Sequence, residues 1–591
     1  MASGSSDKQN TRFISGNEAI ARGAFEAGAR LASAYPGTPS TEILEELIRY
    51  EGVYAEWAPN EKVAVEVAIG ASMAGARALA AMKHVGVNVA ADPIFTASYT
   101  GVGGGLVIVA ADDPELHSSQ NEQDSRHYAL AAKIPMLDPS DSVEAKEYTR
   151  LAFELSEKFD TPFFLRTTTR VSHAKGVVRL EAPSVPKKPP EFARDSTKWV
   201  MLPVNARRRH ALVEERINAL REFAETFSGN RIEWGDRSLG IITGGVSYQY
   251  VKEAFPEASV LKLGMAHPLP ERLIREFASG VSRVVVVEEL DPFIETHVHA
   301  LSIAAEGKNL IPILGELDPR IVRKAITGEA PELRRPALLP PRPPNMCAGC
   351  PHRGFFAALK KTRAVVAGDI GCYTLAALAP LDSMDLCVCM GASIGAAHGF
   401  EKALGEEGRG KAVAVIGEST FLHSGVTGLM NIVYNRGCGT VALLDNGTTA
   451  MTGSQENPST GRTLRGEPTH KLDLEALCRA LGVEHVYTVN PHDIENTEKT
   501  LRREIERPEP SVVIVRASCA LLPEHRKSRK ERPVYQAVSG LCIGCKACAR
   551  LGCPAIGFVE GKARINALLC DGCGQCCPLC KAKAIVGKAK V

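Results

Sequence analysis

The last fifty residues hold an unusual density of cysteines. Of the 17 cysteines in the 591-residue chain, nine lie between Cys542 and Cys580. Two runs each place three cysteines with two residues between neighbours, and a fourth cysteine follows each run. In bacterial 4Fe-4S proteins such a run supplies three ligands to one cluster, and its fourth cysteine ligates the other cluster. This rule assigns one cluster to Cys542, Cys545, Cys548 and Cys580, and a second to Cys553, Cys570, Cys573 and Cys576.

Two details of this tail depart from the usual pattern. Four residues rather than three precede Cys553, and the proline of the second run follows Cys577 rather than Cys580. Cys577 is therefore a surplus thiol that could replace a neighbour. Paired cysteines also suit tetrahedral zinc, but zinc ribbons separate their pairs by long gaps. The pattern favours a two-cluster ferredoxin-like α+β domain that relays electrons. This domain has no evident substrate site, so its electrons must arise upstream.

The composition limits the kinds of partner. The formal net charge is +2, 45% of the residues are hydrophobic, and no uninterrupted apolar run reaches the ~18 residues of a membrane span. The start of the chain is polar and lacks the apolar stretch of an export signal. We therefore expect a cytoplasmic protein that binds neither nucleic acid nor membrane. In that compartment its cysteines are metal ligands or buried thiols rather than disulfides.

Proline-rich and basic stretches divide the chain into four segments. The breaks at 181–192, 332–347 and 523–536 predict domains at 1–180, 181–335, 345–525 and 533–591. In each of the first three segments, apolar runs alternate with helical patterns, which is typical of α/β domains with doubly wound parallel sheets. In the first segment, strands are expected at 85–91 and 103–113, and a helix after residue 41 is expected to be capped by Ser40 or Thr41.

Polar residues follow two strands of the third segment. One strand ends in "GEST" at 417–420, and the next ends in "DNGTTAMTG" at 445–453, after a helix near 425–437. Ligands bind at the carboxyl ends of parallel strands. An acidic residue at the first end and an asparagine at the second can together hold Mg²⁺, which takes oxygen ligands.

This segment resembles the thiamine diphosphate (ThDP) signature, and "FLHSGVTGLMNIVYN" with "LLDNGTTAMTG" is similar to the 2-oxoacid:ferredoxin oxidoreductases, in particular to the alpha subunits of those that act on indolepyruvate. The resemblance runs from about residue 13 to the end. It implies that Glu418, Asn446 and the carbonyl of Thr448 ligate Mg²⁺, although the family usually has aspartate where this chain has Glu418. The residues that the resemblance places around the cofactor are Gly417, Ser419, Thr449 and Thr452.

The resemblance also implies two site residues in the first segment. Family members use a glutamate at the start of a small-residue helix to activate the aminopyrimidine of ThDP. In "APNEKVAVEVAIGASMAGARAL" the matching residue is Glu61, and Glu66 is the competing candidate. An acid that merely favours the helix dipole is the alternative for Glu61. "YPGTPSTE" at 35–42 resembles the active-site loop, in which Thr38 would approach the substrate carboxylate, and the alternative is a plain turn.

The remaining cysteines and histidines give less specific predictions. Pyruvate-oxidising relatives hold a cluster near ThDP on four cysteines at similar places, which implies a proximal cluster on Cys347, Cys350, Cys372 and Cys519. Ordinary buried thiols are the alternative for this scattered set. His352 and His423 are either site or structural histidines. The motif "GVGGGL" at 101–106 precedes a strand rather than following one, so it is not a dinucleotide loop. Four cysteines are expected in the core: Cys387, Cys389, Cys438 and Cys478.

The resemblance implies oxidative decarboxylation of arylpyruvates (indolepyruvate, phenylpyruvate and hydroxyphenylpyruvate) to acyl-coenzyme A, with electrons passed to ferredoxin. It also implies ThDP, Mg²⁺, two or three 4Fe-4S clusters, coenzyme A as co-substrate and a smaller beta subunit in an α2β2 assembly. Two other functions remain open. One is a non-oxidative ThDP decarboxylase or lyase with structural clusters, and the other is an electron-transfer subunit without catalysis.

Overall fold

The computed structural model describes residues 10–184, 191–329 and 343–588, which form two compact units, Met1–Pro336 and Ala337–Val591. Each unit contains two of the four predicted segments. Within the described residues, no helix is long and apolar enough to cross a membrane.

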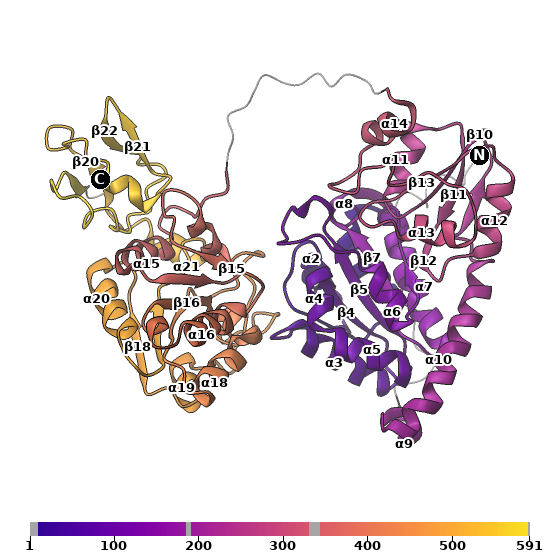
Figure 1. Ribbon diagram of the computed structural model, residues 1–591, viewed down its shortest axis with the longest axis horizontal. Coiled ribbons are helices and arrows are strands. Elements are labelled where there is room, and N and C mark those ends of the chain that lie inside the picture. Colours follow the sequence, from indigo (N-terminus) through magenta and orange to yellow (C-terminus); the bar gives the residue numbers. More distant parts are fainter. Residues whose placement is uncertain (1–9, 185–190, 330–342, 589–591) are drawn as a thin grey trace. The chain divides into compact units, whose positions relative to one another are not determined.

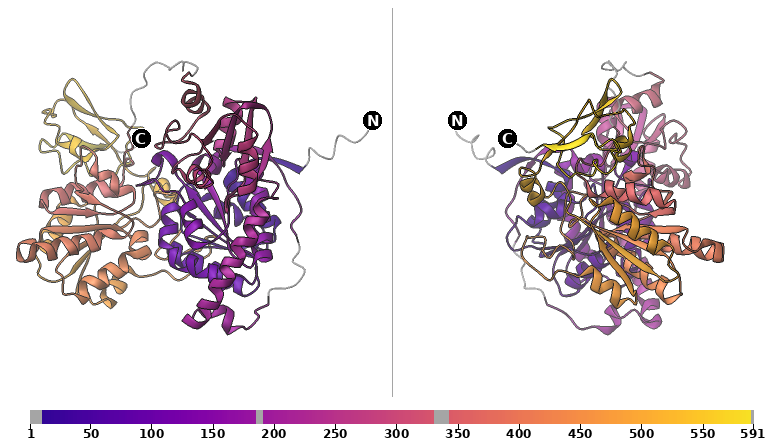
Figure 2. Two further views of the ribbon diagram at one scale, coloured as in Figure 1. Left: turned by 45° about the vertical axis from the view of Figure 1, so that its right-hand side comes forward. Right: turned by 90° about the vertical axis from the view of Figure 1, so that its left-hand side faces the viewer.

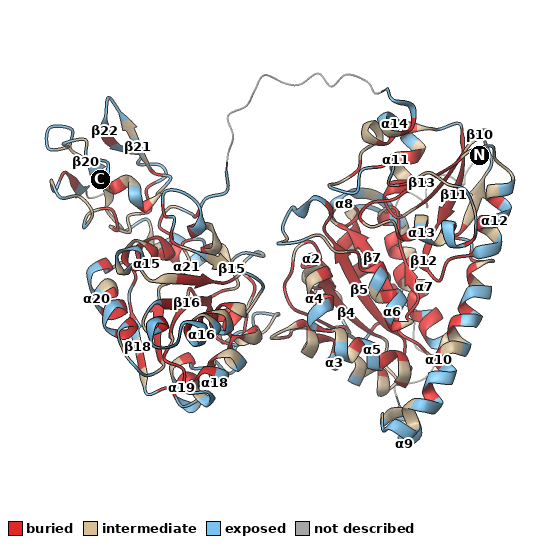
Figure 3. Cartoon of the chain, in the orientation of Figure 1, coloured by how far each residue is buried: buried red, intermediate tan, exposed pale blue. Residues whose placement is uncertain are grey.

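A seven-stranded sheet forms the centre of the first unit (Figure 1). Its strands pair in parallel except β12, which joins β6 antiparallel from the second predicted segment. Because both faces are covered by helices, its longer strands are buried at every residue (Figure 3). The order across the sheet is β12 (Met265–His267), β6 (Met136–Leu137), β7 (Phe163–Thr168), β5 (Leu106–Asp112), β4 (Ala78–Lys83), β2 (Leu31–Ala34) and β3 (Tyr54–Trp57).

Helices follow the strands of this sheet. The pair α1 and α7 pack against each other, and α3, α4, α5 and α6 contribute to one apolar core cluster with β4 and β5. An antiparallel pair, β1 (Thr11–Ser15) and β8 (Lys175–Arg179), completes this part. The helices are α1 (Gly16–Glu26), α2 (Glu42–Leu47), α3 (Glu61–Met73), α4 (His84–Val89), α5 (Ala91–Thr100), α6 (Arg126–Ala132), α7 (Ser142–Phe159) and α8 (Thr169–His173).

Two local predictions for this part are wrong. Residues 84–89 form α4 rather than a strand, because the alanine-rich run before them, β4, occupies the buried strand position. Alternating valines favour a strand only where the sheet has a place for them. The predicted cap of α2 is absent as well. Thr41 has helical backbone angles and makes no capping bond, while the Ser40 hydroxyl donates to the Gly37 carbonyl (2.9 Å).

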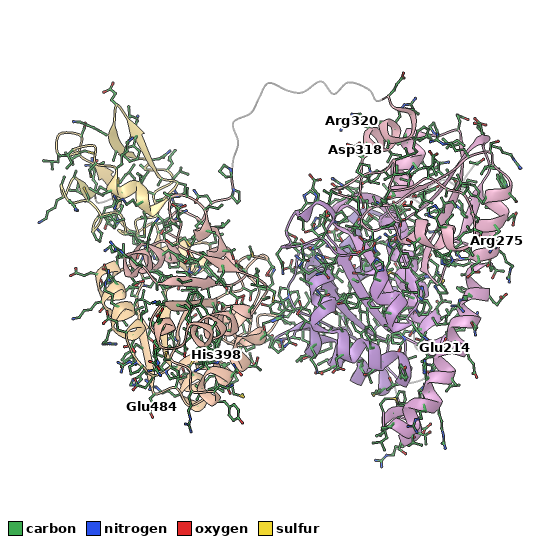
Figure 4. The ribbon with its side chains drawn as sticks, viewed as in Figure 1. Glu214, Arg275, Asp318, Arg320, His398 and Glu484 are labelled. Carbon is green, nitrogen blue, oxygen red and sulfur yellow. The ribbon has the colours of Figure 1, made fainter. Side chains whose placement is uncertain are left out.

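The second half of this unit is a smaller α/β layer. Its four strands, in spatial order, are β13 (Val284–Val287), β10 (Asp236–Gly244), β11 (Ala258–Leu263) and β9 (Arg231–Glu233). Its helices are α11 (Ser247–Ala254), α12 (Glu271–Ser279), α13 (Phe293–Ala300) and α14 (Pro319–Thr327). Asp318 caps α14 by accepting from the Ile321 amide, and its carboxylate lies 3.8 Å from the guanidinium of Arg320 (Figure 4).

A long helix, α10 (Pro203–Ala224), follows the short α9 (Ser196–Trp199) and ties the smaller layer to the seven-stranded part. Arg209 donates to the Tyr99 carbonyl (2.6 Å), and Arg216 donates to the Ser98 carbonyl (2.9 Å). Glu214, which lies on the same helix (Figure 4), pairs with Lys133. Two arginines that lie more than a hundred residues later in the chain therefore hydrogen-bond the carbonyls at the carboxyl end of α5.

The second unit contains a six-stranded parallel sheet between two layers of helices (Figure 2). Val413 and Val415 of one strand enter the core under α15 (Pro351–Leu359) and α20 (Ile494–Ile505), whereas Ala414 and Ile416 enter the opposite core. That second core includes α16 (Ala392–Leu404), α18 (Val426–Tyr434) and α19 (Leu474–Ala480). The strand order is β15 (Leu386–Cys387), β14 (Val365–Gly368), β16 (Ala412–Gly417), β17 (Thr440–Asp445), β19 (Ser511–Arg516) and β18 (His485–Val489).

The cysteine-rich tail forms a small domain of two antiparallel strand pairs. A helix, α21 (Pro523–Ser528), precedes β20 (Val534–Ala537), which pairs with β23 (Ile585–Lys588). The second pair is β21 (Ile556–Val559) with β22 (Lys562–Ile565), after a short 3-10 helix η7 (Ala547–Leu551). The predicted fold class, α/β domains followed by a ferredoxin-like domain, is confirmed.

Candidate active site and cysteine cavities

Glu418 and Asn446 meet at the carboxyl ends of β16 and β17. Glu418 begins the one-turn helix α17 (Glu418–Thr420) directly after β16, and Asn446 follows β17. The amide of Thr448 donates to Glu418 Oε1 (3.1 Å) and to Asn446 Oδ1 (3.1 Å). All three residues are buried. Adjacent parallel strands thus bring together the three residues that the resemblance assigned to magnesium.

The electrostatics of this group favour a cation. Burial, together with the neighbouring carboxylate of Asp445, raises the pKa of Glu418 to about 8, although backbone amides of Asn446 and Thr448 act in the opposite direction. A buried carboxylate without a countercharge tends to take up a proton, whereas a bound cation holds it ionised. The oxygen atoms of Glu418 and Asn446 match the preference of Mg²⁺. The residues present therefore fit this metal.

The other predicted cofactor residues divide into two groups. The Thr449 hydroxyl donates to the Ser419 hydroxyl (3.0 Å), which links the two strand ends a second time. Gly417 donates its amide to the hydroxyl of Tyr373 (2.9 Å). Thr452 instead donates to Gln455 Oε1 (2.5 Å) within its own loop. The structure thus brings Gly417, Ser419 and Thr449 to Glu418, while Thr452 is engaged elsewhere.

The ring of His352 lies against Asn446. Asn446 Nδ2 donates to its Nε2 (3.4 Å), and burial lowers the pKa of His352 to about 4, so the ring is neutral. His423, in the π-helical turn Phe421–Gly425, lies 3.0 Å from the Ser424 hydroxyl. His352 is therefore connected by a hydrogen bond to a predicted metal ligand.

Sequence reasoning missed Asp369, which follows β14 at the same edge of the sheet. Its buried carboxylate accepts from the amides of Ile370 (2.8 Å), Gly391 (2.7 Å) and Ser393 (3.0 Å). It therefore anchors the loop that leads into α16 and the turn that holds Tyr373. An acid just after the short apolar run "AVVA", in "AVVAGDIGCY", was the available signal.

In the first unit, Glu61 is the first residue of α3 and is 5% exposed. Asn60 caps this helix by accepting from the Val63 amide (2.9 Å). An added Cβ on Gly86 of α4 would lie 2.7 Å from Glu61 Cγ, so that glycine allows α4 to approach the glutamate. Glu66 is exposed and pairs with Lys62. Burial thus favours Glu61 over Glu66 as the functional glutamate.

Lys83, which sequence reasoning also missed, ends β4 close to the loop of Thr38. It is 9% exposed, and its ammonium donates to the Ser118 carbonyl (2.9 Å), while the Ser118 hydroxyl donates to the Thr38 carbonyl (3.1 Å). Burial lowers the pKa of Lys83 to about 8, and the carboxylates of Asp113 and Glu61 oppose this shift. The carboxyl end of β4 therefore places a buried cation near Glu61.

The four cysteines of the implied proximal cluster lie in the second unit near Glu418. Cys519 donates its amide to the Asn446 carbonyl (2.9 Å). Burial raises the pKa of Cys350 to about 12 and that of Cys372 to about 11, and neighbouring thiols of the same set add to both shifts. Cys347 is exposed, whereas Cys372 and Cys519 are half-buried. The set is gathered in space, although its members lie up to 172 residues apart in the chain.

The tail contains two small cavities, each lined by one of the predicted cysteine sets. The outer cavity is lined by Cys542, Cys545, Cys548 and Cys580, together with Ile543, Lys546 and Phe558. The inner cavity is lined by Cys553, Cys570, Cys573 and Cys576, together with Gly349 and Asp571. Cys577 lines neither cavity. The fourth cysteine of each run thus lies with the other run, as the crossing-over rule predicts.

The thiols of the tail are spaced more widely than the sulfurs of a formed zinc site. A tetrahedral site with Zn–S bonds of ~2.3 Å places its sulfur atoms about 3.8 Å apart. Throughout the part of the chain that the structure describes, no three cysteine sulfurs lie within 4.8 Å of one another. In a cubane cluster each of four irons carries one thiolate, so the sulfurs are more widely spaced. Backbone amides of Ala563 and Ala584 donate to the sulfurs of Cys542 (3.4 Å) and Cys580 (3.2 Å).

Side chains connect the inner cavity to the parallel-sheet domain. Arg353 of α15 is 1% exposed and donates to the carbonyls of Leu551 (3.0 Å) and Cys347 (3.0 Å). Gln575, beside Cys576, donates to the Cys350 carbonyl (3.1 Å). The inner cavity therefore lies on the side of the tail that faces the proximal cysteines.

The four cysteines expected in the core behave differently from one another. Cys438 and Cys478 are buried, as predicted. Cys387 is half-buried in the edge strand β15, and Cys389, in the loop after it, is exposed. The core prediction is wrong for Cys389, because an edge strand that ends after two residues leaves the following loop outside the packed layer.

Comparison with known proteins gives a family for this arrangement. Residues 22–211 match the model "Pyruvate flavodoxin/ferredoxin oxidoreductase, thiamine diP-bdg", and residues 369–515 match "Thiamine pyrophosphate enzyme, C-terminal TPP binding domain". The indolepyruvate oxidoreductase subunit IorA of Archaeoglobus fulgidus is 43% identical over 97% of both chains. The chain belongs to the IorA family. It is a subunit of a ThDP-dependent 2-oxoacid:ferredoxin oxidoreductase.

Other relatives differ in how much of the chain they cover. IorA of Pyrococcus horikoshii is 43% identical over 96% of this chain and 95% of its own. The 2-oxoglutarate synthase subunit KorA of Methanothermobacter thermautotrophicus is 27% identical over 47% of this chain and 87% of its own. A solved 2-oxoglutarate:ferredoxin oxidoreductase from Magnetococcus marinus covers 54% of this chain and 65% of its own, with 16% identity and a TM-score of 0.46.

Proposed function

We propose that this chain is the catalytic alpha subunit that oxidatively decarboxylates arylpyruvates, chiefly indolepyruvate, and passes the electrons through 4Fe-4S clusters to ferredoxin. The observation that carries the proposal is that Glu418, Asn446 and Thr448 share one compact unit with two cavities, each lined by four cysteines. A decarboxylase that releases an aldehyde has no need for cysteine-lined sites that carry electrons away. The aryl preference is supported by the names of the IorA relatives.

The second unit supplies the groups that would hold the metal and the diphosphate. Glu418 and Asn446 would ligate Mg²⁺ through their side-chain oxygens, and Thr448 through its carbonyl. The Thr448 amide holds both side chains in place, and Asp369 fixes the neighbouring turn. When bound, ThDP supplies the nucleophilic carbon that lets the 2-oxoacid lose carbon dioxide.

The first unit would supply the groups that handle protons and substrate. Glu61 would hold a proton at the aminopyrimidine, and its burial at the start of α3, with Gly86 of α4 against its side chain, supports that role because a packed side chain keeps a fixed position. Thr38 would approach the substrate carboxylate. Lys83 adds a buried positive charge at the same strand edge.

Electrons would leave through the second unit in a defined order. Cysteines 347, 350, 372 and 519 would hold a proximal cluster, because Cys519 is bonded to the backbone of Asn446. The inner cavity would follow, because Gln575 links it to Cys350. The outer cavity would come last, because its Cys545 is exposed. Coenzyme A would take the acyl group, and a smaller beta subunit would complete an α2β2 enzyme in the cytoplasm.

Anaerobic cofactor analysis with turnover tests the proposal. We expect one ThDP and one Mg²⁺ per chain, with about eight irons for two clusters or about twelve if the proximal cluster is present. Indolepyruvate should reduce viologen only when coenzyme A and the beta subunit are added, and the isolated chain should turn over poorly. Release of an aldehyde without an electron acceptor would indicate the decarboxylase instead. Iron without ThDP would indicate a non-catalytic electron-transfer subunit.

A further inference from the structure

The two cavities of the tail differ in what surrounds them. The inner cavity is lined by Gly349 and Asp571, and the buried carboxylate of Asp571 lies 2.9 Å from His525 Nε2 and pairs with the guanidinium of Arg532 (3.1 Å). The outer cavity is lined by Ile543 and Lys546, both of which are exposed. The outer cavity therefore opens to the surface, whereas the inner one is turned toward the sheet domain.

The surface around the outer cavity is basic. Residues 533–588 contain seven lysines and arginines but only two carboxylates, Glu560 and Asp571. The four lysines nearest in sequence to the cavity lining are exposed. Each of these lysines is adjacent in sequence to a residue that lines the cavity. The 542–545 loop also approaches the carbonyl of Gly561, which directly precedes Lys562. The four lysines are Lys546, Lys562, Lys581 and Lys583. The chain as a whole carries only +2, so this excess is local.

Two large apolar side chains lie within this basic surface. Leu541 is 54% exposed and Ile543 is 71% exposed, and they flank Cys542. Exposed apolar side chains rimmed by like charges are typical of a surface that binds a partner of opposite charge. We define the exit surface as Leu541, Ile543, Lys546, Lys562, Lys581 and Lys583.

We propose that the exit surface is the docking site of an acidic one-electron carrier of the ferredoxin type. The inference rests on the proposed function and adds the place and chemistry of the partner. The lysines attract the carrier, and Leu541 and Ile543 hold it with its redox centre next to Cys545. Each encounter moves one electron from the outer cluster to the oxidised carrier, so two encounters follow each 2-oxoacid oxidised.

Charge reversal at two lysines tests the site in the assembled enzyme. The variant Lys562→Glu/Lys583→Glu, at two lysines that do not line the outer cavity, should raise the KM for an acidic two-cluster ferredoxin about tenfold at low salt, with substrate-driven viologen reduction unchanged. Wild-type KM should itself rise between about 20 mM and about 300 mM salt, because these charges are exposed. The matched control is Lys411→Glu/Lys499→Glu, which makes the same charge change at exposed lysines of the sheet domain and should keep the wild-type KM.

Three further results bear on the proposal. An unchanged ferredoxin KM in the first variant, or a salt-independent KM in the wild type, would overturn it. Loss of the beta subunit from the variant on size-exclusion chromatography would assign the surface to that subunit instead. If the variant loses iron, Leu541→Ser, which leaves the cavity lining intact, must raise the ferredoxin KM. If indolepyruvate does not reduce the enzyme, its clusters can be reduced chemically and the rate of electron transfer to ferredoxin still measures docking. The proposed activity and the proposed docking site can therefore fail independently.

Discussion

Substituting Gly86 by alanine probes the role of Glu61 without touching the glutamate. In α4, an added Cβ would lie 2.7 Å from Glu61 Cγ and 2.8 Å from its Oε1. An ordinary contact needs at least 3.4 Å, so the Glu61 side chain must move by about 0.7 Å. Since a ~1 Å misplacement can cost about 100-fold in rate, we expect kcat to fall about 10- to 100-fold.

The assay is anaerobic, indolepyruvate-driven viologen reduction by the complete enzyme, with bound ThDP measured on the same sample. Glu61→Gln gives the turnover that remains without the carboxylate. Its ThDP content should stay near that of the wild type while its turnover collapses. The added methyl group also meets Met82 at 2.9 Å, so a stability loss of roughly 1–3 kcal/mol is expected. Circular dichroism at the assay temperature therefore accompanies the kinetics.

Gly70→Ala is the matched control, because Gly70 lies in α3 itself and nothing is within 4 Å of its added Cβ. Alanine in a helix interior should stabilise the chain by about 0.5–1 kcal/mol and leave kcat unchanged. Wild-type turnover in Gly86→Ala would refute the claim that α4 positions the glutamate. Normal turnover in Glu61→Gln would refute the catalytic role itself.

Three other outcomes are expected. Glu418→Gln should lose Mg²⁺-dependent retention of ThDP, measured by gel filtration, whereas Glu418→Asp should keep it; equal retention in both would contradict the metal assignment. Cys553→Ser should lower the iron content and change the reduced-cluster EPR spectrum, whereas Cys577→Ser should retain the wild-type iron content, and iron loss on changing Cys577 alone would show that it is a ligand. Burial lowers the pKa of His267 from 6.5 to about 4, so the unfolded state binds more protons and stability should fall by up to roughly 3 kcal/mol as the pH drops from 6.5 to 4. In urea unfolding of residues 1–336, the His267→Gln variant should lose part of this pH dependence. If the free energy of unfolding changes with pH as steeply in the variant as in the wild type, His267 is not the group responsible.

Local patterns in the sequence predicted the chemistry well. The cysteine spacing predicted both four-cysteine sets, because three ligands come from one short loop and only the fourth must cross over. Glu418 and Asn446 were predicted together because the carboxyl ends of adjacent parallel strands meet at one edge of a sheet. The prediction of a strand at 85–91 was wrong. A short run of alternating valines fits a strand or a helix, and the choice depends on knowing that Ala78–Lys83 already forms the strand of the sheet.

The sequence by itself thus determined the residue types and the family, and it predicted the two thiol sets of the tail, because these depend on short spacings. Only the tertiary structure chose buried Glu61 over exposed Glu66, and placed Lys83 and Asp369 at the strand edges. It alone gave the two cavities different surroundings, with one against Gly349 and the other open beside Ile543. Burial and access to solvent depend on packing between distant segments, and no local pattern carries that information.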